Sequence, residues 1–329
     1  MADIAESLGV SKNSVSLALR GLDGVGEPLR RRIIEKAIDM GYGGVSLSDG
    51  YKDACLAVIL PEYLHDDAFF YSEVLWSIDS EAKAYEVSAV HIGITRNMES
   101  SGELPAMPRG MRVLGILIVG VFNRAYVEKL KQTGLPMLSV DIMYNGLPYV
   151  GSSNLMGGAA ATRRLIELGH KDIGFVGPIF TATSIYERWC GYCLAMRAAG
   201  LAFDEGWNIL GERVFKLFDT EDVLEPYVRG IEKYPTAWFC AGDRIAIAMI
   251  HLLARLGVKV PEDVSVMGFD DILAAQMVIP QLTTVKTDRK LMGRLAAKYF
   301  FDIRTNKDLS RIGQIVPFDL VERASVKSL

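Results

Sequence analysis

Short continuous apolar runs alternate, from residue 55 onward, with stretches in which apolar residues recur every three to four positions. A continuous apolar run is typical of a strand covered on both faces, and the longer spacing is typical of an amphipathic helix. Strands and helices that alternate in this way form parallel sheets with right-handed crossovers. The predicted strands are 55–60, 87–92, 112–120, 135–141, 172–177, 236–241 and 264–270, and the predicted helices are 70–85, 123–133, 155–168, 185–199, 219–233 and 243–256.

The first 42 residues have a different pattern, with three short amphipathic helices. Ser11 follows the Gly9-Val10 turn and is a good N-cap for the second helix, and Pro28 suits the first turn of the third. Three short helices with this turn spacing predict a helix-turn-helix unit. The expected inward residues are Ile4, Ala5 and Leu8 in the first helix, Val15, Ala18 and Leu19 in the second, and Ile33, Ile34, Ala37 and Ile38 in the third.

Residues 43–54 are rich in Gly, Ser and Asp and have no apolar periodicity, so we interpret them as a linker. The sequence therefore predicts a helix-turn-helix DNA-binding domain at 1–42, a hinge or linker at 43–54 and an α/β core at 55–329. The length of the core suits two doubly wound, Rossmann-like subdomains in tandem.

Composition narrows the classes of protein that fit. Half of the 329 residues are hydrophobic and the net charge is −4, so bulk electrostatics would not draw the chain to DNA or to an anionic membrane. No apolar run is long enough to span a membrane, and the polar N-terminus has no signal segment, so we expect a cytoplasmic protein with no membrane partner. The four cysteines give no disulfide framework, which fits a reducing compartment.

The second helix of the predicted helix-turn-helix unit offers polar side chains to DNA. The N-terminal residues of such a helix meet base edges in the major groove, where Lys12 can donate to guanine and Asn13 can pair with adenine. Serines can bond phosphates. The six basic and six acidic side chains in residues 1–42 leave the unit without the strongly basic face usual for DNA binding. The candidate residues are Ser11, Lys12, Asn13, Ser14, Ser16 and Arg20.

Several motifs, in order along nearly the whole chain, resemble the LacI/GalR (lactose repressor) family of bacterial transcriptional regulators. DIAESLGVSKNSVSLALRG and VGEPLRRRIIEKAIDMGY resemble the family's headpiece. LIELGHKDIGFVG, GVKVPEDVSVMGFDD, PQLTTV and ERAS resemble its effector-binding core. The resemblance implies a DNA-binding headpiece, a hinge and a two-lobed core related to periplasmic sugar-binding proteins. The expected subdomains are about 55–152 plus 286–316 and about 153–285 plus 317–329.

Three positions depart from the family's pattern. Met1-Ala2 stands where members have a Thr cap, which leaves a start further upstream open. Leu17 replaces an Arg of the recognition helix, and an aliphatic side chain there can touch a thymine methyl but no phosphate. The Pro-Asn-x-x-Ala-Arg-x-Leu motif of the family's hinge helix, which pushes a Leu into the minor groove, is missing, and Gly43-Gly44 stands in its place. Leu47 is the nearest candidate for that Leu.

Ligands of doubly wound sheets bind beyond the carboxyl ends of the strands, and two such subdomains that face each other form a cleft. Carboxylates, an Arg fork and aromatic faces at these ends suit a polyol such as a sugar. The candidate effector-binding residues are Phe70, Tyr71, Asp141, Arg188, Asp243 and Asp270.

The resemblance assigns further roles to some of these residues. Arg188 and Asp270 match the family's effector-contacting Arg and the first Asp of its Gly-Phe-Asp-Asp turn. Phe70 and Tyr71 match a lining segment of the first lobe. Asp243 matches an Asp that usually follows an Asn, and Gly242 replaces that Asn here, so Asp243 is either an effector contact or a cap of the helix at 243–256.

We predict a transcriptional regulator, a repressor, that a small molecule in the cleft controls. Its expected partners are a pseudo-palindromic operator, a second copy in a homodimer, and a sugar effector, with a nucleoside or purine as the second candidate. No leucine-heptad tail follows ERASVKSL, so we expect a dimer rather than a tetramer. We expect no cofactor, no metal and no enzymatic activity.

Two other classes stay open: an exported solute-binding protein and a Rossmann-type enzyme. The polar N-terminus argues against export, and no Gly-x-Gly-x-x-Gly opens a helix after a strand. CGYC at 190–193 has the spacing of half a redox or zinc motif, but no second Cys pair follows it, so we interpret both thiols as structural. We interpret His170 as a structural histidine.

Overall fold

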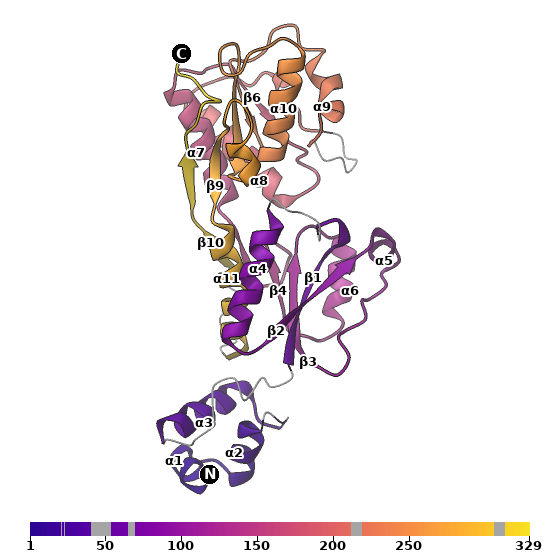
Figure 1. Ribbon diagram of the computed structural model, residues 1–329, viewed down its shortest axis with the longest axis vertical. Helices are drawn as coiled ribbons and strands as arrows, with labels where there is room; N and C mark the ends of the chain where they lie inside the picture. The colour runs from indigo at the N-terminus through magenta and orange to yellow at the C-terminus, as the bar shows by residue number, and fades with distance from the viewer. Residues whose placement is uncertain (21, 23, 41–53, 65–69, 212–218, 306–312) are drawn as a thin grey trace. The chain divides into compact units, whose positions relative to one another are not determined.

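The computed structural model describes residues 1–20, 22, 24–40, 54–64, 70–211, 219–305 and 313–329 (Figure 1). The chain divides into two compact units. Unit 1 comprises Met1–Asp67, Tyr71–Val150 and Lys290–Gln314, and unit 2 comprises Ala68–Phe70, Gly151–Arg289 and Ile315–Leu329. Within the described ranges, no helix is long and apolar enough to cross a membrane.

The N-terminal segment of unit 1 forms the predicted helix-turn-helix headpiece from α1 (Ala2–Leu8), α2 (Lys12–Leu19) and α3 (Glu27–Asp39). Gly9 ends α1 in the left-handed conformation (φ 65°), which a residue without a side chain adopts at little cost. The Ser11 hydroxyl accepts a hydrogen bond from the Ser14 amide, which confirms the predicted N-cap. The headpiece has its own core, formed by Ile4, Ala5, Val15, Ala18, Val25, Ile33 and Ala37.

The α/β part of unit 1 is built on a six-stranded sheet with the order β10-β5-β4-β3-β1-β2. Its strands are β1 (Ala54–Pro61), β2 (Ser88–Ile94), β3 (Arg112–Val119), β4 (Met137–Val140), β5 (Tyr149–Ser152) and β10 (Gly313–Val316). β1 is buried along its whole length and pairs in parallel with β2 and β3, so Val58 lies between His91 and Leu117. The chain also forms a short 3-10 helix at Glu62–Leu64.

Helices cover both faces of this sheet (Figure 1). α4 (Tyr71–Ala84) and α11 (Arg289–Thr305) lie side by side on one face, and α5 (Arg96–Ser101) and α6 (Arg124–Lys131) lie on the other. α4 and α11 approach closely at Gly293, where a Cβ would lie 2.2 Å from the Val74 carbonyl oxygen. The close approach therefore requires glycine at this position.

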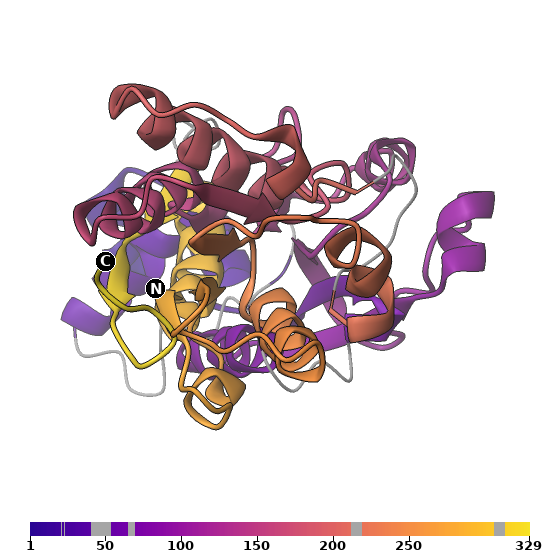
Figure 2. The same ribbon diagram turned by 90° about the horizontal axis from the view of Figure 1, so that it is seen from above.

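Unit 2 contains a five-stranded sheet with the order β11-β9-β8-β7-β6. The strands are β6 (Ile173–Val176), β7 (Ala237–Cys240), β8 (Ser265–Asp270), β9 (Thr283–Thr287) and β11 (Phe318–Val321), and only β11 is antiparallel to its described neighbour. One face is covered by α7 (Asn154–Glu167) and α8 (Thr183–Ala198), and the other by α9 (Glu221–Val228) and α10 (Asp243–Arg255), as Figure 2 shows. Two 3-10 helices, Glu205–Trp207 and Leu273–Gln276, lie in connections.

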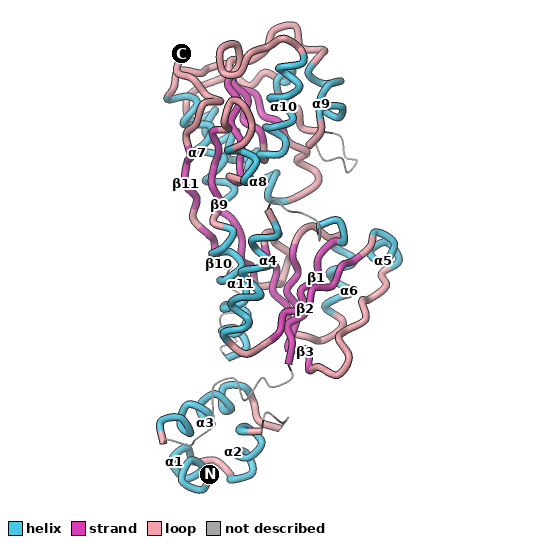
Figure 3. Tube along the Cα trace, viewed as in Figure 1, coloured by secondary structure: helices cyan, strands magenta, loops and turns pink. Residues whose placement is uncertain are grey.

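The predicted fold class is confirmed: an all-α headpiece precedes two doubly wound parallel-sheet subdomains (Figure 3). Element lengths differ in places. The helix predicted at 219–233 is shorter, Glu221–Val228, and it contains Pro226, which cannot donate a hydrogen bond to the helix. β5, β9, β10 and β11 have no continuous apolar run, so the apolar pattern did not predict them.

Candidate functional site

The carboxyl end of β8 forms a tight turn at Asp270 and Asp271, which we call the Asp270–Asp271 turn. Both residues have positive φ angles, 117° and 53°, which side chains other than glycine rarely adopt. Such backbone costs about 1–3 kcal/mol per residue and persists where surrounding contacts impose it. Arg289 supplies two of these contacts by donating to the Asp270 and Asp271 carbonyl oxygens, the second at 3.1 Å. Arg323 donates to Asp271 Oδ1 at 2.6 Å.

Arg188 projects from α8 to the same turn. Its Nη2 lies 3.1 Å from Asp270 Oδ1, its Nε donates to Asn154 Oδ1 and its Nη1 donates to the Ala241 carbonyl. The guanidinium carbon also lies over the Phe269 ring, 3.7 Å from the ring centroid. Arg188 is only 5% exposed, so it fixes the position of the more exposed Asp270 carboxylate. The structure thus brings together the two residues that the family motif singled out.

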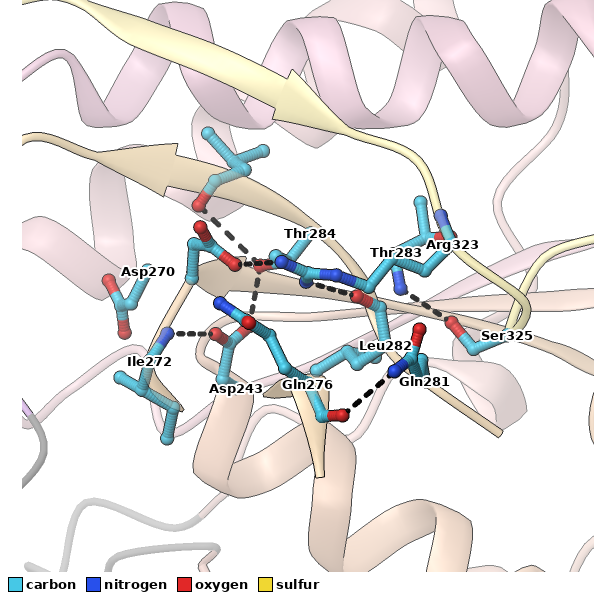
Figure 4. Close-up of polar contacts among 12 residues, drawn as sticks. Asp243, Asp270, Ile272, Gln276, Gln281, Leu282, Thr283, Thr284, Arg323 and Ser325 are labelled. Atoms are coloured by element: carbon cyan, nitrogen blue, oxygen red, sulfur yellow. Dashed lines mark hydrogen bonds and ion pairs between the residues drawn. The ribbon is translucent and has the colours of Figure 1, made fainter. Parts of the chain in front are cut away.

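Asp243 lies beneath the turn, with no exposed surface (Figure 4). Its Oδ1 accepts a hydrogen bond of 2.5 Å from the Thr284 hydroxyl, and its Oδ2 accepts one of 2.8 Å from the Ile272 amide. Its side chain does not cap α10, in contrast to the capping role considered from the sequence. Burial, and then the nearby Asp270 carboxylate, raise the pKa of Asp243 well above its ordinary value. In this structure Asp243 supports the turn from below and does not reach the surface.

Two further candidates meet at the carboxyl edge of the sheet in unit 1. The Tyr71 hydroxyl, from the first residue of α4, donates a hydrogen bond of 2.7 Å to Asp141 Oδ2. Asp141 follows β4 with a positive φ of 70°, and the Tyr149 hydroxyl donates to its carbonyl oxygen. Asp141 is buried and Tyr71 is half-buried, so Tyr71 is the more accessible of the two. Phe70 belongs to unit 2, where its ring centroid lies 5.8 Å from the Arg289 guanidinium carbon.

The headpiece presents the beginning of α2 to solvent. Lys12 and Asn13 are exposed, and so is Arg20, whose Nε donates to the Ser16 carbonyl. The Ser11 hydroxyl is already engaged by the Ser14 amide and hydroxyl. Leu17 is half-buried against the headpiece core. Leu47 lies outside the residues that the structure describes.

Arg30 is a headpiece residue that the sequence analysis did not assign. It is 3% exposed, and its guanidinium donates to the carbonyls of Leu17, Ala18 and Leu22, the last at 2.6 Å. A cation at the C-terminal end of a helix also interacts favourably with the helix dipole, so Arg30 holds the end of the recognition helix α2. Its spacing relative to Ile33 places it on the inward face of α3, and this was the signal available in the sequence.

The two thiols of CGYC form no metal site with the described residues, among which no group of three or more potential ligands occurs. Cys190 and Cys193 line a pocket of about 750 Å³ on α8, together with Trp189 and Phe203. Burial, followed by the neighbouring Cys190, raises the pKa of Cys193 to about 11, so its thiol stays protonated at neutral pH. His170 is fully buried and bonds Thr236 and the Lys327 carbonyl, as a structural histidine does.

This architecture is shared with known proteins. The model of the periplasmic binding protein-like domain family matches residues 162–326. The HTH-type transcriptional repressor PurR of Haemophilus influenzae is 28% identical over 337 residues, covering 99% of this chain and 98% of that protein.

Solved structures match the chain from its headpiece to its C-terminal region. The transcriptional regulator CelR in complex with cellobiose superposes with a TM-score of 0.70 at 24% identity, covering 98% of both chains. The Lac repressor dimer bound to operator and the anti-inducer ONPF superposes with a TM-score of 0.69 at 22% identity, covering 99% of this chain and 98% of that chain. The chain belongs to the LacI/GalR family of ligand-controlled, DNA-binding transcriptional regulators.

Proposed function

We propose that this repressor reads its operator through the first turn of α2 and responds to a polyhydroxylated effector that Asp270 binds. The observation that supports this most directly is the Arg188–Asp270 pair, because the buried guanidinium fixes a carboxylate at the carboxyl edge of a parallel sheet. A fixed carboxylate accepts hydrogen bonds from vicinal hydroxyl groups without first losing side-chain freedom. Tyr71 and Phe70 are the further proposed contacts, and Asp141 acts through Tyr71.

A sugar is the first candidate for the effector. The chemistry of the turn favours hydroxyl donors, and the similar regulator CelR was solved with cellobiose. A LacI family regulator from Enterococcus faecium, 22% identical, was solved with ribose. A nucleoside or purine is the second candidate, since the half-buried Phe70 ring offers a face for stacking. No enzymatic step is proposed, and the action on chromosomal DNA implies a cytoplasmic protein.

We propose that the regulator acts as a homodimer on a pseudo-palindromic operator. The similar Lac repressor was solved as a dimer bound to operator. In unit 2, three large apolar side chains next to the Asp270–Asp271 turn are strongly exposed: Leu273 by 67%, Met277 by 72% and Ile279 by 89%. We call these three residues the apolar patch. Apolar surface of this kind marks an interaction site, and we assign it to the second copy.

The DNA contacts are proposed for residues along α2 and at its two ends. Lys12 and Asn13 read base edges, Ser14, Ser16 and the exposed Arg20 approach phosphates, and Ser11 contributes as the cap that fixes α2. Leu17 is half-buried, so we expect its contact with a thymine methyl to contribute less to binding than the contacts of Lys12 and Asn13.

Fluorescence anisotropy with labelled DNA from the region upstream of the protein's own gene tests the proposal. We expect specific binding whose affinity falls steeply with salt. Asn13→Ala should relax the preference for one A·T pair by about 1–3 kcal/mol, while Asn97→Ala, in exposed helix α5, is the control and should leave binding unchanged. Absence of specific binding, both alone and with ribose, cellobiose, guanine or hypoxanthine, would refute the proposal.

A further inference from the structure

The chain passes from unit 2 to unit 1 directly after Phe70 and again directly after Arg289. The next residues are Tyr71, the first residue of α4, and Lys290, the second residue of α11. The Arg289 guanidinium carbon lies 5.8 Å from the centroid of the Phe70 ring, within the range of a cation–π contact. Two crossing points that are far apart in the sequence are therefore joined by one side-chain pair before the chain enters unit 1.

The same guanidinium holds the Asp270–Asp271 turn. Its Nη1 donates to the Asp270 carbonyl oxygen and its Nη2 donates to the Asp271 carbonyl oxygen. The planar fork of an arginine can bind two neighbouring acceptors at once, which the ammonium group of a lysine cannot do in the same geometry. The position of the Arg289 guanidinium thus depends on the backbone position of the turn that carries the Asp270 carboxylate.

The helices that follow the two crossing points are packed together in unit 1. Gly293 of α11 lies against the backbone of α4, where a Cβ would be 2.2 Å from the Val74 carbonyl oxygen and 2.7 Å from Ser77 Cβ. Lys290 Nζ also lies 3.9 Å from Glu73 Oε1, near the beginning of both helices. The backbones of α4 and α11 are in close contact at Gly293, which allows little sliding of one helix along the other. We therefore expect α4 and α11 to move as one body.

We propose that Arg289 is the positioning residue that connects effector binding at Asp270 to helices α4 and α11. An effector that binds Asp270 favours one arrangement of the turn, because binding shifts an equilibrium only through differential affinity. A shift in the position of the Asp270 and Asp271 carbonyls moves the Arg289 guanidinium. Arg289 is the first residue of α11, and its guanidinium contacts Phe70, which directly precedes α4. This inference rests on the proposed function, since it takes Asp270 as the effector contact.

Arg323 provides a matched control. It also binds this turn, by donating to Asp271 Oδ1 at 2.6 Å and to the Leu282 carbonyl at 2.7 Å. It lies within the C-terminal segment of unit 2, away from both crossing points in the sequence. Arg289→Gln and Arg323→Gln therefore both loosen the turn, but only Arg289→Gln should affect the start of α4 and α11.

The first measurement is hydrogen–deuterium exchange of the full-length, ligand-free protein. We expect Arg289→Gln to speed exchange about tenfold in peptides from 269–273, and also in peptides from the first half of α4 and of α11. Arg323→Gln should speed exchange in 269–273 and leave both helices at wild-type rates. Arg289→Lys should behave like Arg289→Gln, because it keeps the charge and loses the fork. Wild-type exchange in both helices of Arg289→Gln, or equal effects of the two glutamine variants there, would overturn the proposal, as would full rescue by lysine.

The second measurement is the ratio of the operator dissociation constants with and without a probe. The probe is the compound among ribose, cellobiose, guanine and hypoxanthine that raises the Tm of the wild type most. We expect Arg289→Gln to bring this ratio close to one while probe binding weakens only a few-fold, and Arg323→Gln to retain the ratio at saturating probe. An unchanged ratio in Arg289→Gln would overturn the inference and leave the proposed function intact. If no probe binds the wild type, the proposed effector class fails, and the exchange measurement still decides the role of Arg289.

Discussion

The Arg188 guanidinium lies 3.1 Å from the Asp270 carboxylate, with its carbon over the Phe269 ring and its other nitrogens bound to Asn154 and to the Ala241 carbonyl. The arginine is buried and the carboxylate is partly exposed. The pair therefore fixes a partly exposed carboxylate at the carboxyl end of β8. We propose that the arginine acts on an effector mainly through the carboxylate that it positions.

Arg188→Ala should lower both stability and effector binding. Removal of one partner leaves the other without its counter-charge, at a cost of about 3–5 kcal/mol for a buried pair. Thermal unfolding and titration with the effector probe measure the two effects. Arg164→Ala, which removes a half-buried arginine of α7 paired with the exposed Glu322, is the control and should change neither. Normal effector binding by Arg188→Ala would show that Asp270 does not need this partner.

Asp243 should make the protein less stable as the pH rises. Its pKa is raised in the folded state, first by burial and then by Asp270, so the folded state binds its proton more tightly than the unfolded state does. The stabilising contribution is complete below the unfolded pKa of about 4 and decreases as the pH rises through the folded pKa. Urea unfolding from pH 4 to 8 measures the difference between wild type and Asp243→Asn. We expect the free energy of unfolding of the wild type to fall with pH relative to the variant.

Asp243→Ala separates this charge effect from the hydrogen bonds. It leaves the Ile272 amide and the Thr284 hydroxyl without their acceptor, which costs about 1–3 kcal/mol for each buried group. Asn can still accept one hydrogen bond and donate another, as the protonated carboxyl does, so Asp243→Asn should remain close to wild type near pH 4. Equal destabilisation by Asn and Ala would contradict this account of Asp243.

Arg30→Met should weaken operator binding without changing its dependence on salt. The substitution removes hydrogen bonds from a charged donor to the end of α2, each worth about 1.5–3 kcal/mol, and so loosens the recognition helix. A buried arginine releases no counterions from DNA, so the slope of log K against log salt should stay the same. Lys12→Met, which removes an exposed cation, is the comparison. A slope reduced by about 0.9 in Arg30→Met would indicate a phosphate contact instead.

Met277→Glu should convert the proposed dimer to a monomer. The substitution places a charge within the apolar patch of Leu273, Met277 and Ile279, where it would be desolvated at an interface. Sedimentation velocity measures the oligomeric state, and operator anisotropy should show weaker binding because the two headpieces are no longer linked. Leu194→Glu changes an apolar side chain of α8 that is also exposed, by 54%, and should remain dimeric. A dimeric Met277→Glu protein would place the interface elsewhere.

The fold was predictable where the sequence has uniform patterns. β1 and β3 are buried on both faces, so their sequences are apolar throughout or nearly so. β5 reads Tyr-Val-Gly-Ser and β11 reads Phe-Asp-Leu-Val, and neither contains an apolar run or a clear alternation. These short strands exist because neighbouring strands pair with them, which is a tertiary effect that local propensity does not encode.

The site was predictable in part, for a comparable reason. Asp270 stands at the end of an apolar strand, where the carboxyl-edge rule places ligand contacts. The buried Asp243 accepts a hydrogen bond from Thr284, which is 41 residues away in the sequence and lies on β9, the neighbour of β8. Arg289 has no distinctive local pattern, and its contacts become visible only where the chain passes between the two units. Contacts that depend on the meeting of distant segments could not be inferred from spacing.

We propose that a small molecule bound at Asp270 controls operator binding by the headpiece. The most direct test is operator affinity measured with and without the effector probe, in the wild type and in Asp270→Asn. We expect the probe to change the operator dissociation constant of the wild type at least about tenfold, within the usual range of allosteric coupling. Asp270→Asn should bind operator with wild-type affinity and show no change with the probe. An Asp270→Asn protein that responds to the probe as the wild type does would show that Asp270 is not the effector contact.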